Sequence, residues 1–315
     1  VWILYVLYPI CKKMKNKLPN FLIVGAAKSG TSSLHNYLNQ HSEVFMPSYN
    51  KHEMKVKEPR FLIKDLVKHR LHNGIWSWEE YQSLFENVKD AKAIGESSVL
   101  YLYYYKHTIN NIKLRLGNDV KIIIMLRNPT DRAYSAFQHV SRGFQEQHSF
   151  EEALVIEEGR LEKDNNLTPM VMYKDMGLYS KMVKAYLDAF EHVHIILYDD
   201  FRDKTDEVLH NVYQFLAIDK HQIVDSVSRY NVGGKRWKNK RFKQIFMKSN
   251  PLKWVLKSIL PKKIRKGVRD KLVNISMQTV VPMQFETRKM LNDFFKDDVE
   301  KLSDLLNKDL THWTK

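Results

Sequence analysis

A short apolar run is followed directly by a glycine loop and then by a helical pattern, and this order constrains the fold more than any other feature of the chain. The run Phe21–Val24 reads FLIV, as expected for a central strand of a parallel sheet. The loop Gly25–Ser33 reads GAAKSGTSS, and the residues after it, over 32–40, have apolar positions at helical spacing. Such a strand–loop–helix unit can hold a phosphate group with backbone N–H groups and the helix N-terminus.

Further strands and helices alternate along the chain. Buried-strand patterns occur at Ala93–Gly95, Lys121–Leu126 and Val193–Leu197. Asn128 and Pro129 suit an N-cap and a first helical residue, and the later helical patterns cover 178–190, 205–216 and 287–310. We therefore expect an α/β fold of the P-loop-like type, with three layers and a central parallel sheet flanked by helices.

We expect a single domain over residues 18–315, because no repeat or low-complexity linker divides the chain. Residues 1–17 form an apolar and basic N-terminal segment whose ten apolar residues are too few to cross a bilayer. We interpret the segment as the remnant of an anchor or signal, which leaves cytoplasmic, membrane-associated and Golgi-anchored locations open. The single cysteine, Cys11, excludes an intrachain disulfide and a cysteine-based zinc cluster.

The charge is concentrated in one part of the chain. The net charge is +15, and the segment 235–271 alone holds fifteen Lys and Arg against one acid, Asp270. This basic amphipathic segment predicts an anionic partner, either an anionic glycan or a membrane surface. A solvated helical face is the alternative interpretation. We expect no nucleic acid as partner, because the sequence carries no recognised nucleic-acid module.

The glycine loop departs from the pattern of nucleotide kinases and NTPases. In those proteins a lysine directly follows the second glycine of the loop. Here Thr31 has that place, and Lys28 lies two residues before Gly30. The strand Lys121–Leu126 leads into Arg127 instead of an aspartate for magnesium. A P-loop nucleotide kinase is thus the more distant alternative.

Two motifs together resemble a known family. Residues 24–34, VGAAKSGTSSL, resemble the 5′-phosphosulfate loop of the sulfotransferases that use 3′-phosphoadenosine 5′-phosphosulfate (PAPS). Residues 124–135, IMLRNPTDRAYS, resemble the family's 3′-phosphate site. Segments around 197–216 and 286–313 are also similar to the family's later elements. The resemblance implies that PAPS binds to a set of loop, strand-end and helix residues: Lys28, Ser29, Gly30, Thr31, Ser32 and Ser33 for the 5′-phosphosulfate, and Arg127 and Ser135 for the 3′-phosphate.

The resemblance also implies catalytic roles and a reaction. A PAPS-dependent sulfotransferase transfers a sulfuryl group to a hydroxyl or amine by in-line displacement, releases 3′-phosphoadenosine 5′-phosphate (PAP) and needs no metal. Lys28 would stabilise the charge that develops on the leaving phosphate. Glu58 would be the general base, since the segment KEPRFL at 57–62 resembles the acidic segment of heparan sulfate sulfotransferases, about thirty residues past the loop lysine. A surface charge beside Lys57 and Arg60 is the alternative interpretation of Glu58.

Further cofactor contacts are expected late in the chain. The segment 231–237, NVGGKRW, resembles by position the family's loop over the 3′-phosphate and adenine, which implies contacts from Gly234, Lys235 and Arg236. Tyr198, at the end of its strand, is expected to stack on adenine, with core packing as the alternative.

The acceptor is the least constrained part of the prediction. Cytosolic sulfotransferases of small molecules use a histidine after the strand that here reads 93–98, and this chain has none there until His107. The glutamate base therefore favours a carbohydrate acceptor, with a small metabolite or a peptide tyrosine as alternatives. Ser97 stands where glycosaminoglycan enzymes commonly have lysine, and one cysteine cannot form their late disulfide. Both departures weaken a heparan-like assignment and leave the cofactor prediction intact. His35, His41, His52 and His107 are expected to be ordinary surface or helix residues.

Overall fold

A computed structural model of the chain describes residues 17–226 apart from 49, 51, 53 and 144, the backbone of 235–237 and 277–279, and residues 281–315. Of the sequence predictions, the segment before Lys17, the position of Gly234 and nearly all of the basic segment 235–271 lie outside the described residues. For Lys235 and Arg236 the backbone alone is described.

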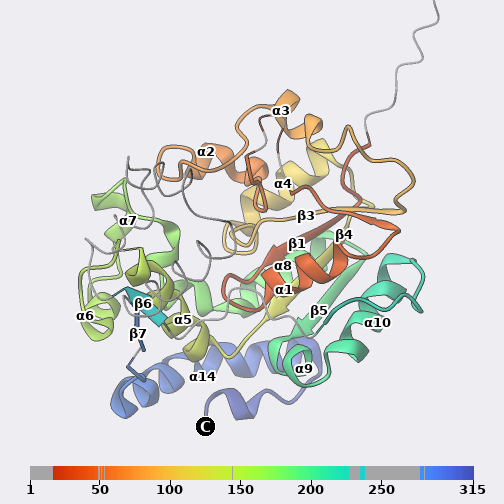
Figure 1. Cartoon of the computed structure of the whole chain (residues 1–315). Coiled ribbons are helices and arrows are strands. Elements are labelled where there is room, and N and C mark those ends of the chain that lie inside the picture. Colours follow the sequence, from red (N-terminus) through yellow and green to blue (C-terminus); the bar gives the residue numbers. More distant parts are fainter. Residues whose placement is uncertain are drawn as a thin grey trace, which may run out of the picture.

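A five-stranded parallel sheet forms the centre of the molecule (Figure 1). All strands run in the same direction, and they pair in the order β2-β3-β1-β4-β5. Their bounds are β1 (Phe21–Gly25), β2 (Val44–Phe45), β3 (Ala93–Ser97), β4 (Lys121–Leu126) and β5 (Val193–Leu197). The four strands predicted from the sequence correspond to β1, β3, β4 and β5 and are thus confirmed. The strand β2 was not predicted.

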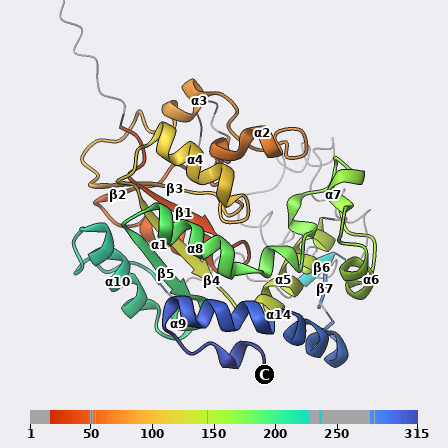
Figure 2. The ribbon, with the colours of Figure 1, turned by 180° about the vertical axis from the view of Figure 1, so that it is seen from behind.

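Helices cover both faces of this sheet, as Figures 1 and 2 show from opposite sides. Leu22 and Val24 of β1 pack into one hydrophobic core with the helices of the first face, while Phe21 and Ile23 pack into a second core on the opposite face. Strands buried on both faces are expected to be continuously apolar. The first face carries α4 (Tyr105–Arg115), α5 (Pro129–Arg142), α8 (Tyr179–Ala189) and α14 (Phe285–Leu306), and the second carries α1 (Thr31–Leu38), α9 (Tyr198–Asp203) and α10 (Thr205–Leu216). The predicted three-layer α/β fold is confirmed.

Short elements complete the described fold. The remaining α-helices are α2 (Lys64–Val67), α3 (Trp78–Ser83), α6 (Phe150–Val155) and α7 (Arg160–Lys163). Short 3₁₀ helices span Phe61–Ile63, Pro169–Val171, Asp175–Gly177 and Thr311–Trp313. Two short antiparallel strands, β6 (Lys235–Trp237) and β7 (Met277–Thr279), pair with each other. Within the described part of the chain, no helix has the length and apolar character needed to cross a membrane.

Candidate active site

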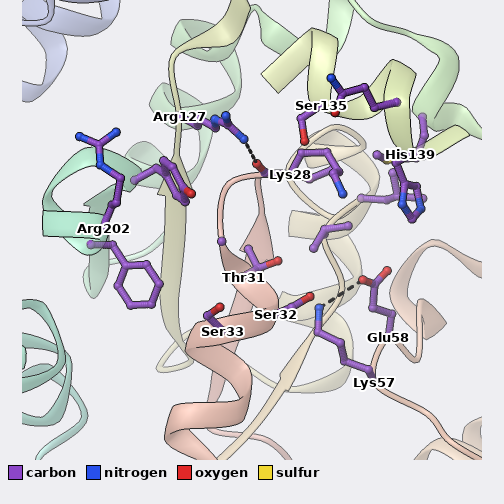
Figure 3. Close-up of a pocket in the computed structure, with 18 of the residues that line it drawn as sticks. Lys28, Thr31, Ser32, Ser33, Lys57, Glu58, Arg127, Ser135, His139 and Arg202 are labelled. Carbon is purple, nitrogen blue, oxygen red and sulfur yellow. Dashed lines mark hydrogen bonds and ion pairs between the residues drawn. The ribbon is translucent and has the colours of Figure 1, made fainter. Parts of the chain in front are cut away.

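A cavity of about 710 Å³ opens where the strands of the central sheet end. Its wall includes residues within two positions of the ends of β1, β3, β4 and β5, together with one face of α5 and residues of the segment 57–60. Ligands of open α/β sheets bind at this carboxyl edge. The cavity is strongly cationic: among the described residues its wall has one carboxylate, Glu58, and six cationic side chains, which are Lys28, Lys57, Arg60, Arg127, Arg142 and Arg202. Figure 3 labels Glu58 and four of these cations, Lys28, Lys57, Arg127 and Arg202.

The glycine loop forms the floor of this cavity through an unusual backbone path. Lys28 and Gly30 both have left-handed conformations, with φ of 73° and 92°. At Gly30 a Cβ atom would lie 3.1 Å from the ring of Tyr198, so that glycine is required for both its conformation and the space. The next residues, Thr31 and Ser32, form the first turn of α1, where backbone N–H groups have no acceptor within the helix. This turn therefore offers N–H donors to an anion in the cavity.

Most of the predicted loop contacts lie on the cavity wall, and one does not. Lys28, Gly30, Thr31, Ser32 and Ser33 line the cavity. Ser29 is fully buried and is not part of the wall, and its N–H donates to the carbonyl oxygen of Ala26 at 3.3 Å. The expected contact of Ser29 with the phosphosulfate stays a prediction.

The predicted 3′-phosphate residues lie on the wall close to the loop. Arg127 follows β4, and its Nη1 donates a hydrogen bond to the carbonyl oxygen of Lys28 at 3.3 Å (Figure 3). Its guanidinium lies 4.8 Å from the ring centroid of Tyr198, the first residue of α9. A cation–π contact of this kind holds the guanidinium in place. Tyr198 also lines the cavity. Its contact with Arg127 is observed, whereas its stacking on the adenine of the cofactor stays a prediction.

One face of α5 contributes more of the wall than the sequence analysis predicted. The helix begins as expected, since the Asn128 side chain accepts a hydrogen bond from the N–H of Asp131 and Pro129 is its first residue. Ser135, Gln138, His139 and Arg142 all line the cavity. They are spaced i, i+3, i+4 and i+7, which places them on one helix face. This spacing, counted from Ser135, is the signal that would have revealed the other three residues.

Glu58 lies on the same wall as Lys28 and is held by two cations. Its Oε1 is 3.4 Å from Lys57 Nζ, and its Oε2 is 3.0 Å from Arg60 Nη2. Burial by itself would raise the pKa of Glu58, but the charges of Lys57 and Arg60 and their hydrogen bonds outweigh it and hold the pKa below its usual value. The carboxylate is therefore ionised at neutral pH and able to accept a proton.

Lys28 and His139 have lowered pKa values for the same reasons. Burial and then the nearby charges of Arg142 and Arg127 lower the pKa of Lys28 to about 8. Partial loss of solvent, followed by the charges of Lys28 and Arg142, lowers the pKa of His139 to about 4. At neutral pH Lys28 is thus a cation that is crowded by other cations, while His139 is neutral. A bound anion would relieve this repulsion.

The cavity also has donor capacity that the protein itself leaves unused. Among the described residues, the buried Nε atom of Arg142 has no hydrogen-bond partner. A buried donor without a partner is costly unless a ligand or water satisfies it. In the same part of the chain no group of three or more His, Cys, Asp or Glu residues is arranged to hold a metal ion. The donor set therefore fits a multiply charged anion with several acceptor oxygens.

A central parallel sheet between two layers of helices, with a cationic strand–loop–helix cradle at its edge, is typical of proteins that bind phosphorylated, multiply anionic ligands. A family model described as a sulfotransferase domain matches residues 18–274. The chain therefore belongs to the sulfotransferase domain family, which confirms the resemblance seen in the two sequence motifs.

Individual relatives agree with this assignment. The chain is 24% identical over 305 residues to human bifunctional heparan sulfate N-deacetylase/N-sulfotransferase 3, covering 94% of this chain and 31% of that protein. It is 22% identical over 258 residues to rat carbohydrate sulfotransferase 15, covering 64% of this chain and 44% of that protein. The chain thus spans less than half the length of these relatives. Among solved structures, a sulfotransferase from Alicyclobacillus acidocaldarius is similar with a TM-score of 0.70 and 29% identity, covering 95% of this chain and all of that one.

Proposed function

We propose that this protein is a PAPS-dependent sulfotransferase that transfers a sulfuryl group to a hydroxyl or amine of a carbohydrate. The observation that carries the proposal is the cavity itself, in which the loop cation Lys28 and the carboxylate Glu58 share one wall lined by five further cations. Support for a carbohydrate acceptor comes from the relatives, whose names describe heparan sulfate and carbohydrate sulfotransferases.

The sulfuryl donor would be held at both of its phosphates. Gly30, Thr31, Ser32 and Ser33 would bind the 5′-phosphosulfate with N–H and hydroxyl donors at the start of α1. Arg127 and Ser135 would bind the 3′-phosphate, for which the planar guanidinium offers two parallel donors. The expected contacts from Gly234, Lys235 and Arg236 stay part of this proposal without support from the described side chains.

Two side chains would carry the chemistry. When PAPS is bound it supplies a sulfur whose bond to the phosphate oxygen breaks as a bond to the acceptor oxygen or nitrogen forms. Lys28, protonated at neutral pH, would neutralise the charge that develops on the departing phosphate oxygen. Glu58, ionised at neutral pH, would take the proton from the acceptor group. Neither role needs a metal ion.

Calorimetric titration with PAP, the desulfated product, tests this proposal. We expect PAP to bind with one site per chain, and the Arg127→Ala variant to bind it about 100-fold more weakly, because two charge-assisted hydrogen bonds are lost. Arg288→Ala is the control, since Arg288 pairs with Asp131 on α5 at 2.8 Å and is not part of the cavity wall. Binding of ATP with magnesium, and not of PAP, would reject the proposal in favour of a kinase. In a panel of acceptors, labelled sulfate is then expected on glycans and not on phenols or tyrosine peptides.

The lowered pKa of Lys28 predicts a specific pH dependence. Because the ammonium form is needed and is lost above about pH 8, kcat/KM for PAPS should fall there and approach a tenfold decrease per pH unit. The sign follows from the charge: Lys28 is a cation below its pKa and neutral above it. The measurement is kcat/KM from pH 6 to 10, which reports groups of the free enzyme. A profile that stays level to pH 10 would contradict the assignment.

A further inference from the structure

A second carboxylate, Glu96, lies inside the protein just beneath the segment that carries Glu58. It belongs to β3, is fully buried and is not part of the cavity wall. Its partners are three neutral hydroxyls. Oε1 accepts hydrogen bonds from Tyr101 at 2.9 Å and from Tyr81 at 3.1 Å, and Oε2 accepts one from Ser98 at 3.2 Å. Burying a carboxylate is costly, and three hydrogen bonds stabilise this one, so we expect Glu96 to have a structural or functional role.

Two of these hydroxyls connect Glu96 to the backbone next to Glu58. Ser98 Oγ accepts a hydrogen bond from the N–H of Arg60 at 2.9 Å, and the Tyr101 hydroxyl accepts one from the N–H of Leu62 at 3.2 Å. A hydroxyl has a single hydrogen, so one that donates to Glu96 turns its lone pairs toward other donors. The carboxylate, which can only accept, therefore sets the direction of both hydrogen bonds.

The backbone that receives these bonds is itself unusual. Arg60 has a left-handed conformation, with φ of 57°, and is not a glycine. Such a conformation persists where the surroundings impose it. The turn at Arg60 also lets its own side chain reach back to Glu58, at 3.0 Å from Nη2 to Oε2. Glu58 thus lies on a short strained segment whose position depends on contacts made beneath it.

We propose that Glu96 is a positioning residue for the reaction: through the hydroxyls of Ser98 and Tyr101 it holds the segment 60–62 and so aims Glu58 at the acceptor. This inference rests on the proposed role of Glu58 as the base. Glu96 touches neither the cavity nor the reacting atoms, and it acts through its two hydroxyl neighbours.

The charge state of Glu96 is part of this arrangement. Burial raises the pKa of Glu96 to about 7, although the hydrogen bonds from Tyr101, Tyr81 and Ser98 oppose the shift, and the charge of Glu58 adds to it. Below this pH the carboxyl group gains a proton, so one of its oxygens becomes a donor and the group can no longer accept hydrogen bonds from both Ser98 and Tyr101 through its two oxygens. In Glu96→Gln the amide has one accepting oxygen and one donating nitrogen, so it has the same limitation at every pH.

Two tyrosines supply a matched pair of variants. Both hydroxyls donate to the same oxygen of Glu96 and both side chains are fully buried, but Tyr101 alone of the two bridges to the backbone of Leu62. We expect Tyr101→Phe and Glu96→Gln to lower kcat at least tenfold, and Tyr81→Phe to stay within about threefold of the unchanged protein. The dissociation constant for PAP should change by less than twofold in all three, because the phosphate cradle lies elsewhere. The melting temperature of each variant is measured as well, so that a loss of kcat can be told from a loss of folding.

The double variant Glu58→Gln/Glu96→Gln separates this inference from the proposed function. If Glu96 acts through Glu58, the double variant is no slower than Glu58→Gln alone. Equal losses in the two tyrosine variants, or losses that multiply in the double variant, would overturn the positioning role while Glu58 remains the base. Full activity in Glu58→Gln alone would instead reject the base and this inference with it. If Glu96→Gln fails to fold, the tyrosine pair alone decides, since each variant lacks a single oxygen atom.

Discussion

Replacing Lys28 with alanine is expected to lower kcat for sulfuryl transfer by about 100- to 1000-fold, the usual effect of removing one preorganised charge donor from a developing anion. Lys28 lies on the cavity floor between the start of α1 and Arg127 (Figure 3). We expect the other cations of the wall to bind the anion in the ground state, whereas the loop ammonium is the one expected next to the departing oxygen. The assay is transfer of labelled sulfate at saturating PAPS.

Stability gives an independent check on the Lys28 variant. The pKa of Lys28 is lowered by burial and by Arg142 and Arg127, so its protonated form is less favourable in the folded chain than in the unfolded one. Removing this crowded cation should therefore leave the melting temperature unchanged or raise it. Lys92→Ala is the control, because that exposed lysine pairs with Glu43 away from the cavity. Near-normal turnover in a well-folded Lys28→Ala variant would remove Lys28 from its proposed role.

Replacing Glu58 with glutamine is expected to lower kcat by about 100- to 10,000-fold, which is the range that a positioned general base contributes. The amide has nearly the same shape as the carboxylate but cannot take a proton from the acceptor. Since PAP contacts are assigned to the loop, α1, Arg127 and Ser135, the dissociation constant for PAP should stay within about twofold. Single-turnover rates and PAP titration measure the two quantities separately.

His139 provides the decisive comparison for the Glu58 variant. It is the one histidine among the described residues that lines the cavity, and its pKa of about 4 leaves it neutral and able to accept a proton at pH 7. We expect His139→Gln to keep far more activity than Glu58→Gln. If the two results are reversed, the base is His139, and the sequence-based choice of Glu58 is wrong.

The layout of the fold followed from local patterns. Continuous apolar runs predicted β1 and β4, because a strand buried on both faces has no polar position to interrupt the pattern. The edge strand β5 was also predicted, although His194 interrupts its apolar run. The strand β2, Val44–Phe45, escaped notice because two residues are too few to show any period. It lies at the edge of the sheet beside β3.

Only part of the candidate site could be predicted from the sequence, and the reason is physical. The loop and the Arg127 motif are each one continuous stretch of sequence, so their candidate residues could be named without a structure. Gln138, His139 and Arg142 reach the cavity through the helical turn of α5, which required a known helix face. The burial of Ser29 and the left-handed backbone at Lys28 next to it are features that no side-chain pattern predicts.

The sequence by itself determined the alternation of the main strands and helices along the chain, the glycine loop between β1 and α1, and the family to which the chain belongs. The tertiary structure alone decided which charges meet. Glu58 lies thirty residues from Lys28 along the chain, yet the two share one cavity wall. The pKa values of Lys28 and Glu96 depend on burial and on neighbours brought in by other elements. Electrostatic and desolvation energies depend on distance in space and on exclusion of water, and only folding sets these two quantities.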